Sequence, residues 1–564
     1  MVSIVDDSMF KLSYNKRKNT KLFSSLEKHN IRKLQNFIPI YNNFFELNET
    51  NSQNINLNHK YHITDIHKKI NDNKYVCQVK NDKDISLKKE CFFKFSPLLD
   101  PIKFMIGKYD ISSNLLKLPS FKDTKCHKKI RCANNSAYVD GFFSYLTSKL
   151  LNSQRFLHGT EFYGSFIAIK EQFHYNVFDD FDYLNDSDFF HKNVDKLFWI
   201  NNETANFFYG NSRHCKLKLE IDDKIETLSC EDINDKNFDD IFIKTEDIHK
   251  TPPKELIFEY DLSKNKTENS KTNHSNSTCS SRSSHTESLT SESDSEKSSD
   301  QSDTTSNNSE EILDAVIKDF PVNIICLESL DNTLDNLLYG DKILSIPEWK
   351  SILFQVLFIL ATYQKVFSFT HNDLHTNNIM YKEVDKNQCI YYYINGKYYK
   401  IPTFGRIFKI IDFGRAIYKF RHKTICSDSF QNKGDAATQY NFEPFLNKNK
   451  PRLEPNFSFD LARLACSLYD YFVPYSDEER KVTHPIGKII IKWCTDDKGK
   501  NILYKKNGDE RYPDFKLYKM IARTVHNHIP LNELKNEIFN DYVTTKKRLK
   551  GKRVINFDKL CKCF

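Results

Sequence analysis

The sequence has few glycines, and none precedes Gly107. No GxGxxG string occurs, so the usual glycine-rich phosphate loop is missing. None of the 14 cysteines forms a CxxC pair, which argues against a zinc ribbon or a disulfide framework and favours a reducing, intracellular compartment. No apolar run approaches the roughly 20 residues of a membrane span, and the acidic start MVSIVDDSMF does not resemble a signal peptide. We therefore expect a protein without a transmembrane segment.

Charge is nearly balanced, with 83 Lys and Arg against 75 Asp and Glu, and the net charge of +8 is small for 564 residues. Nucleic acid is therefore not an expected partner, because proteins that bind nucleic acid concentrate their Lys and Arg residues in a patch. Lys and Arg residues are frequent in the tail, residues 546–564, which we expect to be solvated. Cys561 lies fourth from the end, in the outline of a prenylation box, but charged Lys562 argues against this route to a membrane.

One segment differs sharply in composition from the rest of the chain. Residues 263–311 consist largely of Ser, Thr, Asn and acidic residues, with one leucine and no aromatic residue. Such a segment cannot bury enough apolar surface to offset the entropy of ordering, so we expect a disordered insert. Serines that precede acidic residues, such as Ser291, Ser293 and Ser295, also make it a candidate phosphorylation target.

Periodicity predicts a mixture of strands and helices. Strand-like runs lie at 75–79, 90–95, 164–170, 255–261 and 322–327, and RIFKIID ends a further strand at Asp412. Helical periodicity covers 135–151 and 347–369. After the second helix and before the RIFKIID strand, Asn395-Gly396 predicts a hairpin closed by a two-residue type I′ turn. The fold class expected from this pattern is α+β.

Two short strings carry the chemistry. HNDLHTNN, residues 371–378, follows the second helix and contains Asp373 and Asn378, five positions apart. IIDFG, residues 410–414, places Asp412 at a strand end, where Gly414 allows a sharp backbone turn. Phosphoryl transfer to a hydroxyl needs these groups: a base for the hydroxyl proton and oxygen ligands for magnesium.

Together these strings resemble the HRDxxxxN and DFG motifs of the protein-kinase superfamily. The resemblance implies an enzyme that uses ATP and Mg²⁺. It makes Asp373 the catalytic base, Asn378 a ligand of the second magnesium and Asp412 the main magnesium ligand. The residues that it implies as structural support are His371, Phe413, Gly414 and Asp460, the last from SFDLARLACSLYDYF.

The same resemblance implies a two-lobed kinase fold. Residues 61–330 would form a small β-rich N-lobe with large inserts, and residues 331–545 a larger, mainly helical C-lobe. Residues 1–60 would be an N-terminal extension.

The lysine that contacts the nucleotide phosphates has two candidates. Lys170 ends IAIK, a literal match to the kinase string VAIK. Lys94, in ECFFKFS, is followed by helix, strand and strand, the order of the small lobe, and we favour it. Its ion-pair partner would then be Asp140, where the family has glutamate. Leu327 would be the gatekeeper, and the backbone from Glu328 to Leu330 would hold adenine.

The chain departs from the family at several points. The phosphate loop near residues 65–75 has no glycine, Asn372 replaces the arginine of HRD, and no Ala-Pro-Glu string occurs. His375 stands where serine/threonine kinases usually have lysine and is similar to small-molecule phosphotransferases. A kinase for a small molecule of the aminoglycoside or choline type, and a pseudokinase that only binds partners, are therefore alternatives.

Longer strings resemble the serine/threonine kinases of large DNA viruses of the mimivirus type. These strings are SPLLDPIKFMIGKYD, SAYVDGFFSYL, THNDLHTNNIMY and RYPDFKLYKMIARTVHNHIP. The resemblance implies transfer to serine or threonine of a protein substrate, and a location in the host cytoplasm or the virion.

Overall fold

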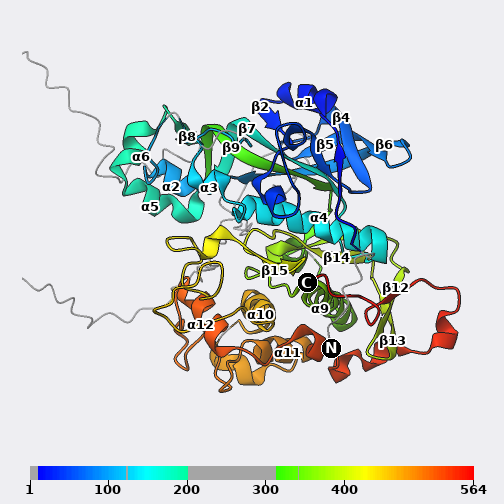
Figure 1. The fold of residues 1–564 in the computed structure, drawn as a ribbon. Coiled ribbons are helices and arrows are strands. Elements are labelled where there is room, and N and C mark those ends of the chain that lie inside the picture. The colour runs from blue at the N-terminus through cyan, green and yellow to red at the C-terminus, as the bar shows by residue number, and fades with distance from the viewer. Residues whose placement is uncertain (1–9, 113, 122–124, 201–312, 341, 475) are drawn as a thin grey trace, which may run out of the picture. The chain divides into compact units, whose positions relative to one another are not determined.

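The computed structural model describes residues 10–112, 114–121, 125–200, 313–340, 342–474 and 476–564 (Figure 1). The described part is an α+β protein, as the sequence pattern predicts. Its longest strands precede residue 330, and its longest helix follows it. The strand expected at 255–261 and the Ser-rich segment 263–311 lie outside the described residues.

A seven-stranded antiparallel sheet dominates the first half of the described chain. Its strand order is β2-β7-β9-β6-β5-β4, and β8 also pairs with β9. The strands are β2 (Ile31–Gln35), β4 (Tyr61–Lys69), β5 (Lys74–Asn81), β6 (Ser86–Pro97), β7 (Phe162–Asn176), β8 (Phe198–Ile200) and β9 (Asp314–Glu328). In β5 the buried residues Tyr75, Cys77 and Val79 alternate with half-exposed ones, so one face of the strand meets the core.

Helix α4 (Ser136–Gln154) packs against β7 and β9 of this sheet (Figure 1). It begins where the Asn135 side chain accepts the N–H of Ala137 at 3.0 Å, and it ends at Arg155 in a left-handed conformation. Asn323 Nδ2 of β9 donates to the carbonyl of Ala137 at 2.8 Å, which joins the helix to the sheet. The helix predicted at 135–151 is confirmed and extends three residues further.

The first 60 residues also contain regular structure. β1 (Tyr14–Lys16) pairs with β3 (Ile55–Leu57), and β2 joins the edge of the large sheet beside β7. The shorter helices of the first half are α1 (Thr20–Glu27), α2 (Pro101–Met105), α3 (Lys128–Arg131), α5 (Phe181–Asn185) and α6 (Asp188–Asn193).

The second half is built around helix α9 (Ile346–Phe367), which is buried along most of its length. Ser345 and Glu348 form a capping box at its start, and the helix ends two residues before the predicted position. The other helices are α8 (Leu334–Leu338), α10 (Phe459–Phe472), α11 (Pro485–Trp493), α12 (Lys516–Thr524) and α13 (Pro530–Glu533). Within the described ranges, no helix has both the length and the apolar character needed to cross a membrane.

Short strands connect these helices. β11 (Ile379–Glu383) pairs with β14 (Arg406–Ile410) and with β10 (Asn332–Thr333). The predicted hairpin is confirmed as β12 (Cys389–Ile394) and β13 (Lys397–Pro402), with positive φ at both Asn395 and Gly396, as a type I′ turn requires. The remaining strands are β15 (Ile417–Phe420), β16 (Lys423–Cys426), β17 (Val543–Thr544) and β18 (Val554–Asn556).

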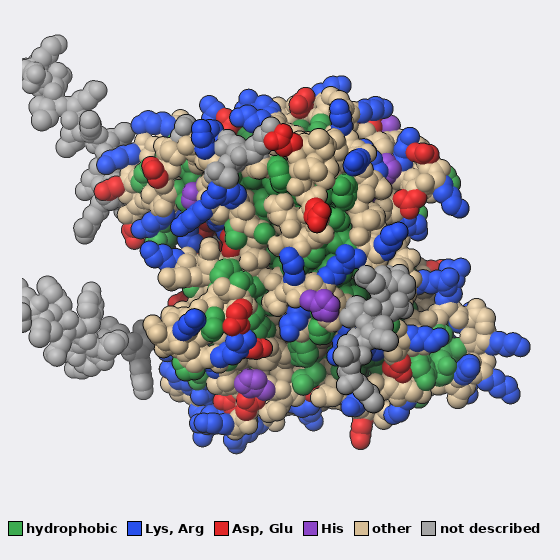
Figure 2. All heavy atoms as spheres, viewed as in Figure 1, with side chains coloured by type: hydrophobic (Ala, Val, Ile, Leu, Met, Phe, Trp, Pro, Cys, Tyr) green, Lys and Arg blue, Asp and Glu red, His purple; other side chains and the backbone are tan. Residues whose placement is uncertain are grey.

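Several turns are 3₁₀ helices: η1 (Pro39–Asn43), η2 (Ser52–Asn54), η3 (Phe178–Asp180), η4 (Thr376–Asn378), η5 (Asp428–Phe430), η6 (Ser476–Lys481), η7 (Glu537–Tyr542) and η8 (Lys546–Leu549). The basic tail contains η8 and β18, and β18 pairs in parallel with β12. Near its end the N–H of Cys563 donates to Val366 of α9 at 2.8 Å. Lys and Arg side chains are spread over the face seen in Figure 2 and are interspersed with acidic ones.

Candidate active site

The loop 371–378 follows α9 and is held by a buried aspartate of α10. Asp460 Oδ2 accepts the backbone N–H of His371 at 2.9 Å, and Oδ1 accepts that of Asn372 at 2.9 Å. His371 Nε2 lies 2.9 Å from the carbonyl oxygen of Ile411. This loop is therefore fixed both to α10 and to the segment that follows β14.

Asp373 has one carboxylate oxygen in direct contact with other side chains. Its Oδ1 accepts the hydroxyl of Tyr518 at 2.9 Å and lies 3.5 Å from Arg415 Nη1. Burial alone would raise the pKa of Asp373, but Arg415 and then His375 outweigh it and hold this pKa below its usual range. The carboxylate therefore stays ionised and able to accept a proton.

Asn378 is oriented by hydrogen bonds from its side-chain N–H groups. Nδ2 donates to the carbonyl of Asp373 at 2.9 Å and lies 3.0 Å from His375 Nε2. Burial lowers the pKa of His375 to about 4, so the ring is neutral near pH 7 and its Nε2 can accept this bond. Because the amide nitrogen is used in this way, the amide oxygen of Asn378 is the atom available for a metal.

Asp412 follows β14 in a left-handed conformation, with φ of 62°. Its Oδ1 accepts the N–H of Gly414 at 3.3 Å and lies 2.9 Å from Lys94 Nζ. Although burial opposes it, the Lys94 ammonium holds the pKa of Asp412 below its usual range. The N–H of Ile411 donates to the carbonyl of Asn378 at 3.0 Å, so the two strings meet through their backbones.

Lys94 lies between two carboxylates. Its Nζ is 2.7 Å from Asp140 Oδ2 on α4 and 2.9 Å from Asp412 Oδ1, and the side chain is 11% exposed. Burial would lower the pKa of Lys94, but the two carboxylates outweigh it and raise this pKa. Lys170 lies elsewhere, on β7, with its Nζ 4.0 Å from the centre of the Phe95 ring. Of the two candidate lysines, Lys94 is the one that the structure brings to Asp412.

Phe413 joins α4 to the same group. Its N–H donates to Asp140 Oδ1 at 3.0 Å, so Asp140 contacts both Lys94 and the backbone beside Asp412. The buried ring of Phe413 packs against Phe143 of α4, with 4.7 Å between ring centres. The position of α4 is thus coupled to that of Asp412.

Lys94, Asp140, Asp373 and Asp412 line one cleft, whereas Asn378 is not part of its lining. Its walls include Lys94, Asp140, Asp373, Asp412, Gly414, Arg415, Ser429 and Asp435. Two side chains that contact Asp373 had not been singled out from the sequence, Arg415 and Tyr518. Tyr518 lies within RYPDFKLYKMIARTVHNHIP, and no local pattern distinguishes it from the other aromatic residues of that string.

The residues expected to hold adenine lie at the end of β9, outside the lining of this cleft. Leu327 and Leu330 are buried. The carboxylate of Glu328 contacts Lys409 of β14 and accepts the N–H of Glu161 at 2.9 Å. The N–H of Glu328 donates to the carbonyl of Glu161 at 3.0 Å. The side chain and N–H of Glu328 are thus engaged with neighbouring segments.

The turn between β4 and β5 occupies the region expected to be the phosphate loop. Asn71 Oδ1 accepts the N–H of Asn73 at 3.0 Å and that of Lys74 at 2.7 Å. Lys69 Nζ lies 2.5 Å from Asp72 Oδ1. The Asn71 side chain thus satisfies two backbone N–H groups of a turn that has no glycine.

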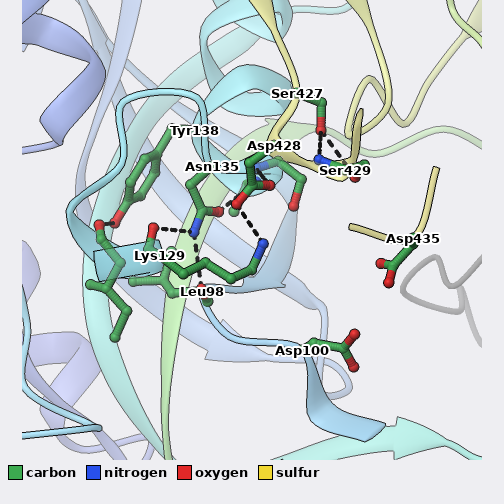
Figure 3. A network of polar contacts seen from close by, with 12 residues as sticks. Leu98, Asp100, Lys129, Asn135, Tyr138, Ser427, Asp428, Ser429 and Asp435 are labelled. Atoms are coloured by element: carbon green, nitrogen blue, oxygen red, sulfur yellow. Dashed lines mark hydrogen bonds and ion pairs between the residues drawn. The ribbon is translucent and has the colours of Figure 1, made fainter. Parts of the chain in front are cut away.

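Asp428, on the segment that follows Asp412, contacts the region before α4 (Figure 3). Its Oδ2 lies 2.6 Å from Lys129 Nζ, and its Oδ1 accepts the N–H of Ser136, the first residue of α4, at 3.1 Å. The N–H of Asp428 donates to the carbonyl of Asn134 at 2.7 Å. Nothing in the sequence pattern had indicated this link between η5 and α4.

Asn372 links the loop 371–378 to the segment that follows Asp412 through neutral hydrogen bonds. Its Nδ2 donates to the carbonyl of Arg415 at 3.0 Å, and its Oδ1 accepts the hydroxyl of Tyr440 at 2.7 Å. An arginine at this position, as in HRD, would carry a charge where Asn372 makes neutral hydrogen bonds.

No protein-family model matches the chain. Three curated proteins are similar to parts of it. They are a protein of Dictyostelium discoideum named as a serine/threonine-protein kinase (35% identical over 118 residues), one of Acanthamoeba polyphaga mimivirus with a similar name (31% over 149 residues), and the serine/threonine-protein kinase haspin of Bos taurus (39% over 72 residues).

These matches are partial on both sides. They cover 19%, 25% and 13% of this chain, and 9%, 34% and 9% of the three relatives, in the same order. The chain thus matches no more than about a third of the length of any of these relatives. The similarities suggest the kinase superfamily and support phosphoryl transfer in general.

Proposed function

We propose that the protein is a serine/threonine-protein kinase that transfers the γ-phosphoryl group of ATP in the presence of Mg²⁺. The observation that carries this proposal is the position of Lys94, which contacts Asp140 and Asp412 in the cleft that Asp373 also lines. Phosphoryl transfer needs a lysine for the phosphates, a carboxylate for the metal and a nearby base. The partial similarities to serine/threonine kinases support the same class of reaction.

The proposal includes a two-lobed kinase fold. Residues 61–330 would be the N-lobe and 331–545 the C-lobe, with residues 1–60 and 546–564 as an extension and a tail. With the short elements left out, the chain order is β4, β5, β6, α4, β7, β9. This order supports the assignment, because Lys94 lies on the third of these strands and Asp140 on α4, the first long helix after it.

Asp412 and Asn378 suit Mg²⁺ by their chemistry. Carboxylate and amide oxygens are the protein ligands that this ion takes, and it keeps several waters and substrate phosphates as its other ligands. The described residues hold no group of three or more His, Cys, Asp or Glu that could hold a metal ion by itself. Bound Mg²⁺ would neutralise charge on the phosphates.

The remaining residues bind and orient the substrates. Lys94 would contact the phosphates while Asp140 holds its ammonium in place. Asp373 would take the proton of the serine or threonine hydroxyl, because it is an ionised carboxylate that lines the cleft. The backbone from Glu328 to Leu330 remains the proposed adenine contact.

The test is transfer of label from γ-labelled ATP to casein by the purified full chain with Mg²⁺. An Asp412→Asn variant runs beside the wild type. Asp509→Asn is the matched control, because it alters an exposed carboxylate that contacts Lys505 and Asn507 outside the cleft. We expect label on serine or threonine with the wild type and the control, and at least about a 100-fold loss with Asp412→Asn.

Two other outcomes would overturn the proposal. Transfer of label to an aminoglycoside or choline but to no protein would assign the small-molecule kinase instead. Absence of any transfer while the chain still binds partners would assign a pseudokinase.

A further inference from the structure

A chain of two hydrogen bonds ends on the candidate base. Arg463 Nε of α10 donates to the hydroxyl oxygen of Tyr518 at 2.9 Å, and this hydroxyl lies 2.9 Å from Asp373 Oδ1. Tyr518 is 1% exposed, and Arg463 and Asp373 are each 5% exposed. All three side chains are therefore buried.

The direction of both hydrogen bonds follows from the groups involved. A guanidinium can only donate, so the oxygen of Tyr518 must accept from Arg463. The one hydroxyl hydrogen of Tyr518 is then free to donate, and Asp373 Oδ1 accepts it. Burial raises the pKa of Tyr518 above its usual value of 10, so this hydrogen is retained across the working pH range.

The ring that carries the hydroxyl is held on several sides. Tyr518 lies on the buried face of α12 and stacks on Phe515, with 5.3 Å between ring centres and 20° between ring planes. The guanidinium of Arg463 lies 5.1 Å from the centre of the Tyr518 ring, and that of Arg415 lies 5.7 Å from it. The hydroxyl is thus preorganised with respect to Asp373.

Tyr518 contacts the base from outside the lining of the cleft. Asp373 lines the cleft, whereas Tyr518 is not part of its lining. Oδ1 of Asp373 is engaged by Tyr518 and Arg415, which leaves Oδ2 for a substrate hydroxyl.

From this arrangement, and resting on the proposed kinase function, we infer that Tyr518 is a positioning residue that sets the orientation of the Asp373 carboxylate. It acts through Asp373 and does not touch the substrate. Loss of the hydroxyl removes the hydrogen bond that holds Oδ1, so the carboxylate can turn away from the position in which it accepts a substrate proton.

Other charged and titratable groups also surround Asp373 and remain in place when the hydroxyl is removed. They are His371 and His375 on its own loop, Arg463 and Asp460 on α10, and Arg415 on the segment after Asp412. Loss of the hydroxyl alone therefore isolates the contribution of Tyr518.

The test compares Tyr518→Phe with the wild type in the full chain, by steady-state kinetics from pH 4 to 9. We expect kcat to fall about tenfold with the KM for ATP within about twofold, because only the base is disturbed. Tyr542→Phe is the matched control, since its nearly buried hydroxyl donates to Pro347 outside the cleft, and it should change neither quantity.

A Tyr518→Phe variant with wild-type kcat would overturn the inference while the kinase function stands. Wild-type chain that transfers no label would overturn the proposed function and this inference together. Should Tyr518→Phe fail to fold, Arg463→Lys provides the second test, because it keeps the charge and removes the Nε that orients the hydroxyl. Its expected result is a smaller loss of kcat, again with the KM for ATP within about twofold, and unchanged kinetics would reject the inference.

Discussion

Asp140 Oδ2 lies 2.7 Å from Lys94 Nζ, so an aspartate on α4 reaches the lysine on β6 without the extra methylene of a glutamate. Gly141 explains how. A Cβ at this residue would lie 3.1 Å from Asn323 Nδ2 and 3.4 Å from Ser165 Oγ, so the absent side chain lets α4 approach β7 and β9 closely. The short side chain of Asp140 is matched to a short distance between helix and sheet.

This match predicts that a branched side chain at Gly141 separates Asp140 from Lys94. Gly141→Val would overpack the contact with Asn323, and we expect about a tenfold loss of kinase activity and about 2 kcal/mol of unfolding free energy. Ser153→Val, at an exposed position on the same helix, controls for the helix propensity of valine. Equal activities of the two variants would show that the close packing of α4 on β7 and β9 is not required for activity.

The two candidate lysines should respond differently to substitution. Lys94→Met removes the contact with Asp412 and should lower label transfer at least about 100-fold, whereas Lys170→Met should leave transfer within about twofold of wild type. Thermal unfolding of both variants checks that they fold, because Lys94→Met leaves two buried carboxylates without their cation. The reverse pattern of activities would assign the phosphate contact to Lys170.

The contact between Asp428 and the start of α4 should affect activity, although Asp428 does not line the cleft. Asp428→Asn removes the ion pair with Lys129, and we expect activity three to ten times lower, with about 1 kcal/mol less stability, because the start of α4 loses a favourable negative charge. Asp541→Asn breaks a similar 2.7 Å pair with Lys350 at a site where the aspartate is 74% exposed, and should have little effect. Hydrogen exchange over residues 136–154 would detect the loosening, and unchanged exchange would contradict it.

Stability should fall in mild acid because of His158. Its Nδ1 lies 2.7 Å from the carbonyl of Phe408 and its Nε2 2.7 Å from the hydroxyl of Tyr392, so the ring donates to one and accepts from the other as a neutral group. Burial lowers the pKa of His158 from 6.5 to about 4. The unfolded chain therefore binds the proton first, and the free energy of unfolding decreases as pH falls from 6.5 towards 4.

Between pH 7 and pH 5 this one histidine should cost about 2 kcal/mol. Urea unfolding at the two pH values measures the loss, and His158→Phe should be less stable at pH 7 but lose about 2 kcal/mol less than wild type on acidification. His375, whose pKa is also lowered to about 4, adds a second contribution of the same sign in both proteins. An equal loss in wild type and variant would show that His158 is not the group responsible.

Local patterns predicted the local features of this protein. The 3.6-residue period located α4 and α9 to within a few residues, and Asn395-Gly396 located the hairpin turn, because each depends on neighbours a few positions away. The short elements of residues 10–60 were not predicted, since strands of three to five residues give little periodicity.

Contacts between distant positions could not be read in the same way. Tyr518 is 145 positions from Asp373, and Lys129 is 299 positions from Asp428. Neither pair has a spacing that any helix or strand imposes. The literal string ending at Lys170 carried no information about where its ammonium lies, which is over Phe95.

Asn378 and Asp412 lie at adjacent ends of β11 and β14, whose register pairs Ile379 with Ile410. Backbone pairing therefore sets how close these two candidate metal ligands lie, whatever the length of the connection between the strands. In this chain the connection is the hairpin β12–β13, whose Tyr392 packs on Phe358 of α9. Insertions and deletions between the two strings are thus compatible with an intact site, and relatives whose strings are much closer together or further apart would preserve the same chemistry.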